Sequence, residues 1–544
     1  MTARTQAIRR VYSLRTFVSL CGVLFLPLAP SGTSFALAQM RGDFPVNNTH
    51  IVYHDVKVDS NGSIVPWYNN KPSVAYDHDL RLLWNFWKGM RTCGDGIPYY
   101  LQHQVWKENE DDPRGIGGDQ IDMTIDSWNL LYGYLGDPAL HDNMTMMADF
   151  YLKHGMSAPS LLYANLPYPY DLEVCSGHFD GDMRGGEGYL QPDKAGAFGA
   201  NLVLLYKLTG NRHYLTAAIK IANALEATAM PGDADHSPWG FRVDAATGTP
   251  ATGTRDGKVI TASYTTNWTP TLELFSQLQA LRMGKIRNYR RASALVEAWL
   301  KKYVLPANKW GPFFEDIGTE HYSDTEINAD TLAAYILEHP EWGSDASAQA
   351  LNILQWTETR LGNHSFAALH VMPINEQTAY LVPGNSHTAR HAWVRLLYCE
   401  KTSDCADRDE QVRRLNWATY SVNDDGRNRY PNDDIWLTDG YGDYVRHYLR
   451  AMASMPELAP DDQNHLLRTN SVIQKIEYKA DAISYRKFDA HSIERFKLGA
   501  GVPVRVQGGS FTWNPETKVL AIHAQAKDVC IYLNHADNQR GNAN

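Results

Sequence analysis

The sequence AGAFGANLVLLYKLTGNRHYLTAAIKIANALEATA, at residues 195–229, decides the fold of this chain. Its apolar residues recur at spacings of three and four on both sides of a short polar break, which places them on one face of an α-helix. The first half shows this spacing at Leu202, Leu205 and Leu208. The break contains Gly210, a residue that commonly ends a helix. The stretch therefore predicts two antiparallel helices, over 195–208 and 214–229, joined by a tight turn.

The same pattern of two helical segments around a short turn occurs five times. We expect hairpins at 123–135 with 139–154, 195–208 with 214–229, 269–282 with 289–304, 328–338 with 346–361, and 388–400 with 411–420. Two further apolar helices, at 74–90 and 441–455, flank this array and form a sixth pair if its ends meet. The prediction is a mainly α chain, an (α/α)6 toroid of helical hairpins, whose closure buries faces that an open repeat has to cap. The alternative is an open helical repeat of the tetratricopeptide kind, but the connections here are long and irregular.

The loops between the hairpins are much longer than the turns within them. They occupy 92–120, 155–194, 231–266, 305–324, 362–387 and 422–438. Loops beyond about 15 residues are usually functional or disordered, and the many aromatic and charged residues here argue against disorder. In a closed ring all of these loops leave from the same end, so we expect the active site at that end.

Both flanks of the helical array have the alternating pattern of β-strands. Residues 50–68 alternate around Asn61-Gly62, which predicts an N-terminal β-hairpin. From about residue 462 short alternating runs predict a small all-β domain. The expected organisation is a signal peptide at 1–38, the hairpin segment at 39–73, the toroid at 74–460 and a β-sandwich-like domain at 461–544.

The N-terminus has the features of a secretory signal peptide. Arg4, Arg9 and Arg10 precede a short apolar run, which is followed by Ala36-Leu37-Ala38. A membrane anchor is the alternative, but the run is shorter than the ~20 apolar residues of a span. We therefore expect a periplasmic or secreted protein with no membrane span after signal removal. The net charge of −10 argues against a nucleic-acid partner.

The cysteines suit an oxidising compartment. Cys399 and Cys405 are close enough to form a disulfide that closes a short loop. Cys93 and Cys175 could pair if their loops converge, and no cysteine spacing is typical of a zinc site.

Three phrases carry a resemblance to a known group of enzymes. They are Phe198-Gly199-Ala200-Asn201, residues 205–211 and residues 214–218. Together with the hairpin array, the signal and the β-domain, they resemble the six-hairpin glycosidase and polysaccharide lyase superfamily over roughly residues 75–540. The resemblance points to no single family. It implies a secreted enzyme that cleaves glycosidic bonds, with a carbohydrate as its substrate.

Glycoside hydrolysis needs two carboxyl groups that face each other across the scissile bond. The loop at 178–194 is richest in candidates, and Asp182 and Glu187 are our first acid–base pair, with His178 beside them. The alternative is that the acids of this loop cap the next helix or bind calcium.

Other loops offer further acids. Asp119 opens the first hairpin, where an N-cap role is as plausible as catalysis. Glu315 and Asp316 follow Phe313, and aromatic rings beside acids suit a sugar site. The loop at 424–436 mixes acids with Arg427, Tyr430 and Trp436, where calcium could bind without EF-hand spacing. No cofactor is otherwise expected.

Aromatic and cationic side chains in the loops could bind the sugar. The candidates are Arg184, Tyr189, Trp239, Arg242, Trp268, Trp310, Phe313 and His387. Arginines bind carboxylates in a bidentate manner, so several of them would favour the rival chemistry, β-elimination on a uronate-containing glycan. Its base would be a Tyr or His such as Tyr264 or His387. A third hypothesis is a non-catalytic glycan-binding surface protein.

Overall fold

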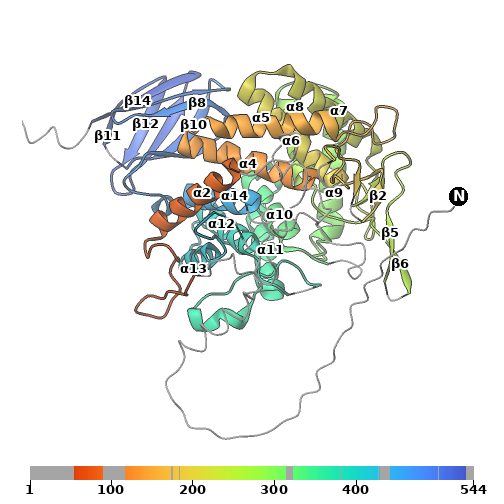
Figure 1. Cartoon of the computed structure of the whole chain (residues 1–544), viewed down its shortest axis with the longest axis horizontal. Helices are drawn as coiled ribbons and strands as arrows, with labels where there is room; N and C mark the ends of the chain where they lie inside the picture. Colours follow the sequence, from red (N-terminus) through yellow and green to blue (C-terminus); the bar gives the residue numbers. More distant parts are fainter. Residues whose placement is uncertain are drawn as a thin grey trace, which may run out of the picture.

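The computed structural model describes residues 54–89, 117–172, 176–182, 184–255, 257–313, 323–379, 381–426, 428, 441–499 and 501–534. This part of the chain is mainly helical and has a C-terminal β region (Figure 1). None of its helices is long and apolar enough to cross a membrane. The predicted signal peptide lies outside the described residues.

The described helices form six antiparallel pairs. They are α4 (Gly117–Leu135) with α5 (Ala139–His154), α6 (Pro192–Thr209) with α7 (Arg212–Thr228), α8 (Thr269–Ala280) with α9 (Ile286–Trp299), α10 (Glu326–Glu338) with α11 (Ala346–Leu361), α12 (Asn385–Thr402) with α13 (Arg408–Thr419), and α14 (Tyr441–Ser454) with α2 (Pro72–Lys88). The five predicted hairpins are confirmed. The helix α9 continues into a π-helical turn, Leu300–Val304.

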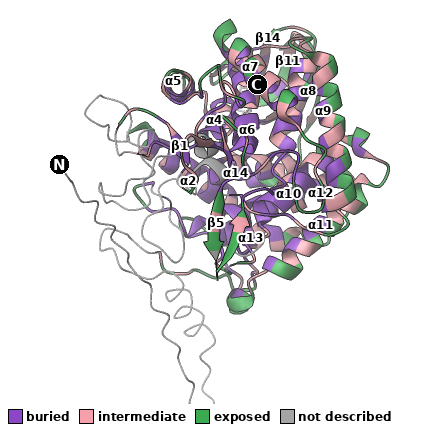
Figure 2. Cartoon of the chain, turned by 90° about the vertical axis from the view of Figure 1, so that its right-hand side faces the viewer, coloured by how far each residue is buried: buried purple, intermediate pink, exposed green. Residues whose placement is uncertain are grey.

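The array of pairs closes on itself. The first helix of each pair packs on the first helix of the next, from α4 through α6, α8, α10 and α12 to α14, and α14 packs back on α4. The partner helices lie outside this inner set, and α2 packs against both α13 and α14. Figure 2 shows buried residues concentrated at the centre of the helical region and exposed residues on its outer helices. The prediction that the first and last helices meet is therefore confirmed.

The stretch 195–229 folds as its apolar period predicts. Gly210 ends α6 with a φ of 75°, and its N–H donates to the carbonyl oxygen of Tyr206 at 2.8 Å. Gly199 allows α6 to approach α8 closely, because a Cβ there would lie 2.6 Å from Leu274 Cδ2. The inner helix α6 is thus buried on most sides, whereas α7 buries one face.

The C-terminal β region consists of two four-stranded antiparallel sheets that share one core. The strand orders are β12-β13-β10-β7 and β11-β14-β9-β8. Their bounds are β7 (His465–Thr469), β8 (Ile473–Tyr478), β9 (Ala482–Lys487), β10 (Ser492–Lys497), β11 (Val502–Gln507), β12 (Gly509–Asn514), β13 (Val519–Ala524) and β14 (Asp528–Asn534). The rings of Tyr485 and Phe496 meet between the sheets at 5.5 Å. Strand β7 packs against α4 and α14, which attaches this region to the helices.

Part of the predicted N-terminal hairpin lies within the described residues. From residue 54 onward it is a short hairpin around Gly62, in which the Val65 N–H donates to the Lys57 carbonyl oxygen at 3.1 Å. The segment also bonds to the ring: the Lys57 N–H donates to the Tyr420 hydroxyl at 2.8 Å, and the Ile64 N–H donates to the Leu369 carbonyl oxygen at 3.1 Å.

The predicted disulfide between Cys399 and Cys405 is confirmed. Cys93 and Cys175 lie outside the described residues, so their pairing stays a prediction. Cys530 on β14 is half-buried and forms no disulfide.

Candidate functional site

The first turns of the inner helices lie at one end of the ring, which we call the loop end. Each inner helix follows a long connection, whereas each outer helix from α5 to α13 follows the short turn of its hairpin. The N-termini of the inner helices therefore point the same way, and the positive ends of their dipoles gather there. Buried charged side chains occupy these first turns.

Glu326, His387 and Arg390 form one buried cluster at the loop end. Glu326 is the first residue of α10, and its side chain is 0% exposed. The Nδ1 atom of His387, on α12, lies 2.8 Å from Glu326 Oε2, and the Arg390 guanidinium donates to the same oxygen. The carboxylate thereby orients the imidazole ring, which is the arrangement that proton transfer by histidine requires.

The environment of Glu326 favours its protonated form. Burial raises the pKa of Glu326 well above its ordinary value, and the Asp330 carboxylate one turn later adds to this rise, while Arg390 opposes it. Burial acts on Asp330 as well, but His391, whose Nδ1 lies 2.7 Å from Asp330 Oδ2, lowers the pKa of Asp330. Of these two carboxyl groups, Glu326 is the one whose pKa is raised and Asp330 the one whose pKa is lowered.

A second buried cluster surrounds Lys194 at the start of α6. Its Nζ lies 3.2 Å from Asp193 Oδ2, which also accepts a hydrogen bond from Asn267 Nδ2 at 2.9 Å. The same ammonium group lies 2.8 Å from the centroid of the Phe313 ring. Phe313 packs against Ile327, the neighbour of Glu326 in α10. Lys194 therefore lies against an aromatic ring that belongs to a small core cluster with Met123 and Ile327.

Asp182 is a buried anchor between two loops. Both of its oxygens accept hydrogen bonds from the Arg242 Nε, at 2.9 and 3.0 Å, and Gln191 Nε2 donates at 2.7 Å. The N–H groups of Arg184 and Gly185 donate to Oδ1, each at 2.8 Å. Because protein donors bind both of its oxygens, Asp182 has the geometry of a residue that positions the two loops. Its catalytic role stays a prediction.

Asp182 and Glu187 do not face each other. They lie on the two-residue strands β1 (Gly181–Asp182) and β2 (Gly186–Glu187), where Asp182 pairs with Gly186. Directly opposite residues share a face and successive residues alternate, so Glu187 lies on the other face. It is exposed, as are His178 and Arg184. The structure thus places the two carboxyl groups on different faces of this small sheet, and their expected roles as an acid–base pair stay a prediction.

Most of the expected aromatic lining belongs to the hydrophobic core. Trp239, Trp268, Trp310 and Tyr264 are each at most 2% exposed. The Tyr264 hydroxyl donates to the Lys309 carbonyl oxygen, and the indole N–H of Trp268 donates to that of Thr265. These four rings pack in the core, and their expected roles as a base or a sugar platform stay predictions. Tyr189 is half-buried against a small cluster that contains Phe241.

Several predicted site residues lie outside the described residues. They are Glu315, Asp316, Arg427, Tyr430 and Trp436. The backbone of Asp119 lies in α4, but its side chain is not described. Within the described ranges no group of three or more His, Cys, Asp and Glu side chains could hold a metal ion.

A cavity of about 280 Å³ lies between the inner helices of the ring. Its wall includes Asp122 and Asp126 of α4, Glu273 of α8, and Arg446 and Arg450 of α14. Asp126 Oδ2 binds both guanidiniums, with 3.2 Å to Arg446 Nη1 and 2.7 Å to Arg450 Nη2. These ion pairs join α4 to α14, at the seam that closes the ring.

Sequence reasoning missed Glu326 and Asp193 as site residues. Both are acids in the first turn of an apolar helix, where an acid is common because it stabilises the helix dipole. The sequence does show that both acids begin helices that follow long loops. In a closed ring, the first turns of such helices lie at the loop end.

The closed array of six helical pairs defines an (α/α)6 toroid. Cellobiose 2-epimerase from Bacillus thermoamylovorans B4167 is similar in structure, with a TM-score of 0.52 and 13% identity over 70% of this chain and 98% of that chain. A sugar epimerase from a ruminal bacterium has a TM-score of 0.51 and 10% identity over 69% of this chain and 98% of that chain. A family 76 glycoside hydrolase from a bovine Bacteroides thetaiotaomicron strain has a TM-score of 0.45 and 11% identity over 71% of this chain and 78% of that chain.

The two likenesses with TM-scores above 0.5 confirm the resemblance to the six-hairpin superfamily at the level of the fold. A polysaccharide lyase and a family 15 glucoamylase from Hypocrea jecorina are similar at lower TM-scores, 0.44 and 0.46. No protein-family model and no curated protein matches the sequence.

Proposed function

We propose that this chain is a glycoside hydrolase that cleaves a polysaccharide or oligosaccharide by acid–base catalysis at the loop end. The observation that carries the proposal is Glu326, a fully buried carboxyl group whose pKa is raised by burial and by Asp330. A general acid in glycoside hydrolysis has to stay protonated near neutral pH, and burial is the usual means. The proton of Glu326 passes to the leaving oxygen as the bond to the anomeric carbon breaks.

Asp193 is the proposed second carboxylate. It lies at the start of α6, another inner helix, and its partner Lys194 lies over the ring of Phe313. Its Oδ1 is buried and has no hydrogen-bond partner among the described residues. That oxygen can accept a proton from the attacking water or stabilise positive charge at the anomeric carbon. Lys194 and Asn267 hold the other oxygen in place.

Elimination is the second candidate, and a different observation favours it. His387 is oriented by Glu326 and lies one turn from Arg390. An oriented imidazole can remove the C5 proton of a uronate, and a guanidinium can neutralise its carboxylate. The substrate would then be an acidic glycan.

One screen separates these reactions. Purified protein is incubated with neutral and acidic polysaccharides while reducing ends and the ultraviolet absorbance of unsaturated sugars are followed together. Hydrolysis predicts new reducing ends without new absorbance, and elimination predicts both. Because the neighbours with the higher TM-scores are named epimerases, the sugars are also separated by chromatography. Isomerised sugars with intact glycosidic bonds would contradict both candidates.

We also propose that the protein is exported, on the basis of the basic and apolar N-terminus. N-terminal sequencing of the protein recovered from its native host tests this, and a mature start near Gln39 is the expected result. An intact Met1 would contradict it.

A further inference from the structure

His391 lies between two carboxyl groups inside the ring. It is on α12, one turn after His387, and its side chain is 0% exposed. Its Nδ1 lies 2.7 Å from Asp330 Oδ2 on α10, and its Nε2 lies 3.2 Å from Glu358 Oε1 on α11. A neutral imidazole has one N–H and can donate to only one carboxylate. If both carboxyl groups are ionised, the two contacts require an imidazolium.

The groups around Glu358 keep it ionised. Its carboxylate accepts hydrogen bonds from Arg395 Nη2 and from Arg414 Nη1, each at 2.9 Å. Burial raises the pKa of Glu358, but His391 and the two guanidiniums lower it further, so the net shift is downward. An ionised Glu358 has no proton to give to the imidazole, so the proton between them belongs to His391.

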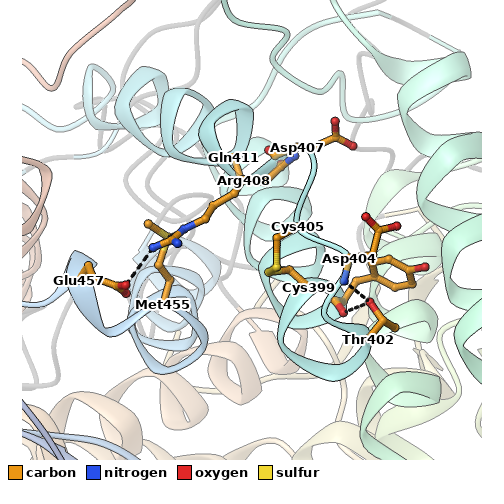
Figure 3. The surroundings of a disulfide bond; sticks show 10 residues. Cys399, Thr402, Asp404, Cys405, Asp407, Arg408, Gln411, Met455 and Glu457 are labelled. Carbon is orange, nitrogen blue, oxygen red and sulfur yellow. Dashed lines mark hydrogen bonds and ion pairs between the residues drawn. A yellow bond between two sulfur atoms is a disulfide. The ribbon is translucent and has the colours of Figure 1, made fainter. Parts of the chain in front are cut away.

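The two guanidiniums are themselves held by the turn that the disulfide closes. Figure 3 shows Asp407 and Gln411 in the segment that follows Cys405. Arg395 Nη2 lies 2.9 Å from Asp407 Oδ2, and Arg414 Nη1 donates to Gln411 Oε1 at 2.8 Å. The row of charged side chains that begins at the loop end therefore continues to the outer surface of the ring.

Asp330 accepts hydrogen bonds on both of its oxygens. Thr357 Oγ1 donates to Oδ1 at 2.9 Å, and Oδ2 faces His391. Glu326 lies one turn earlier in α10, and its carboxyl group forms a hydrogen bond with that of Asp330. Two carboxyl groups can form such a bond only if one of them carries a proton. Because His391 and Thr357 already donate to Asp330, the proton belongs to Glu326.

The contacts of Glu326 show which of its oxygens carries this proton. Oε2 lies 2.8 Å from His387 Nδ1 and accepts from the Arg390 guanidinium. Oε1 is buried and accepts no hydrogen bond from any described residue. A buried carboxylate oxygen without a donor is costly, whereas a protonated Oε1 donates to Asp330. The proton therefore lies on Oε1.

We infer that His391 is a positioning residue of the proposed site, an imidazolium that keeps Asp330 ionised and one proton on Glu326. The two carboxyl groups form a coupled pair with a single proton, and the charge of His391 decides which of them holds it. With a neutral His391, Asp330 would compete for that proton. The inference rests on the proposed function only for the use of the proton in catalysis.

The groups that face His391 determine when it loses its charge. Burial lowers the pKa of His391, but Asp330 of α10 and Glu358 of α11 raise it, and Arg414 of α13 opposes them; the net shift is upward. On its own helix the nearest charged groups are Arg390 and Arg395. His391 should therefore stay protonated at a pH where an ordinary histidine is neutral.

The direct test is nitrogen-15 NMR of the histidine side chains in the full chain, at about pH 8, where a histidine of ordinary pKa is neutral. The His391 signal is the one that disappears in His391→Gln, and it should be that of an imidazolium. If His391→Gln does not fold, Glu358→Gln identifies the signal instead. Loss of one contacting anion should move the midpoint of the His391 titration down by about one pH unit.

Glu400→Gln is the matched control. Like Glu358, Glu400 has a side chain that is 20% exposed and pairs with two arginines, here Arg468 and Arg495. It lies on α12 more than two turns after His391, so its loss should leave the His391 titration unchanged. If the protein cleaves a glycan, its activity should fall at a lower pH in Glu358→Gln, with KM unchanged, and at the original pH in Glu400→Gln.

The outcomes separate this inference from the proposed function. A charged His391 and an activity profile that moves only in Glu358→Gln support the inference. A neutral His391 at about pH 8 would overturn it, whatever the protein catalyses, and so would identical activity profiles in the two glutamate variants. A charged His391 in a protein without hydrolytic activity would support the buried imidazolium and contradict the proposed function alone.

Discussion

Glu326 is the residue on which the proposed chemistry depends, since it is a buried acid with two cationic or protonatable partners. Glu326→Gln keeps the size of the side chain and removes the proton. We predict that kcat falls by about 10²–10⁴, the usual contribution of a general acid. The protein should remain folded, because the amide oxygen can still accept from Arg390. Retention of full activity would remove Glu326 from the mechanism.

The dependence of activity on pH tests the role of Glu326 in a second way. A raised pKa keeps Glu326 protonated at higher pH than an ordinary glutamate. Activity should therefore persist toward neutral pH and fall as the pH rises through that pKa. The residual activity of Glu326→Gln should lack this fall. An identical fall in both proteins would assign it to another group.

Asp182 should behave differently, because its ion pair with Arg242 is buried, at 0% and 1% exposure. Removing one partner leaves a buried charge, which costs about 3–5 kcal/mol. We predict that Asp182→Asn lowers the free energy of unfolding by about this amount in urea titration, while kcat of the folded fraction is retained. Glu187→Gln is the control and should change stability by less than about 0.5 kcal/mol, because Glu187 is exposed. A stable but inactive Asp182→Asn protein would restore the catalytic role.

At this scale the sequence identifies residue types more readily than roles. Asp182 stands out in a glycine-rich loop, but its partner Arg242 is 60 residues away, and no local pattern shows that the two are buried together. From the sequence, Trp268 and Trp310 are aromatic residues of loops. Their burial depends on tertiary packing, which no local pattern shows. From the sequence, Glu326 is an ordinary acid in the first turn of a helix. Its burial follows only from closure of the ring.

At the scale of elements, β7 is attached to the ring by His465. Its ring stacks on Tyr134 of α4 at 3.8 Å, and Nδ1 donates to the Tyr134 carbonyl oxygen at 2.9 Å. Burial lowers the pKa of His465 from 6.5 to about 4; Asp77 and Asp462 oppose this shift, and Arg81 adds to it. Protonation would bury a charge on Nε2, which has no partner among the described residues.

The linkage gives a pH prediction for this contact. Because the pKa of His465 is lower in the folded protein, its contribution to stability is present above pH 6.5 and is lost as the pH falls toward 4. The loss amounts to about 3 kcal/mol. His465→Gln should therefore show a flatter dependence of the unfolding free energy on pH between 7 and 4 than the unchanged protein. Parallel curves would contradict the buried, neutral imidazole.

The elements that the sequence predicts well are those with a local cause. The helices α6 and α7 follow from the period of their apolar residues and from Gly210. The short N-terminal hairpin follows from its alternation and its turn at Gly62, but its further hydrogen bonds, to Tyr420 and Leu369, join residues more than 300 positions apart. Alternation shows that a segment can be extended but does not show what it pairs with.

For the whole molecule, the central claim is that the helical pairs close into a ring and so gather the inner-helix first turns at one end. The sequence predicts this closure from the number of pairs and from the apolar helices at both ends of the array. The seam is visible in the structure, where Asp126 of α4 binds Arg446 and Arg450 of α14, more than 300 residues later. In an open array these residues would lie at opposite ends.

The most direct test of closure is chemical cross-linking across this seam. Asp126→Cys combined with Arg450→Cys is treated with a short bis-maleimide, and the cross-linked peptides are identified by mass spectrometry. The account predicts an efficient link between positions 126 and 450, because their side chains lie 2.7 Å apart in the ion pair. Asp126→Cys combined with Ser347→Cys, on the exposed face of α11, should give no such link. Absence of the 126–450 link in folded protein would contradict the closed ring and the shared site at its loop end.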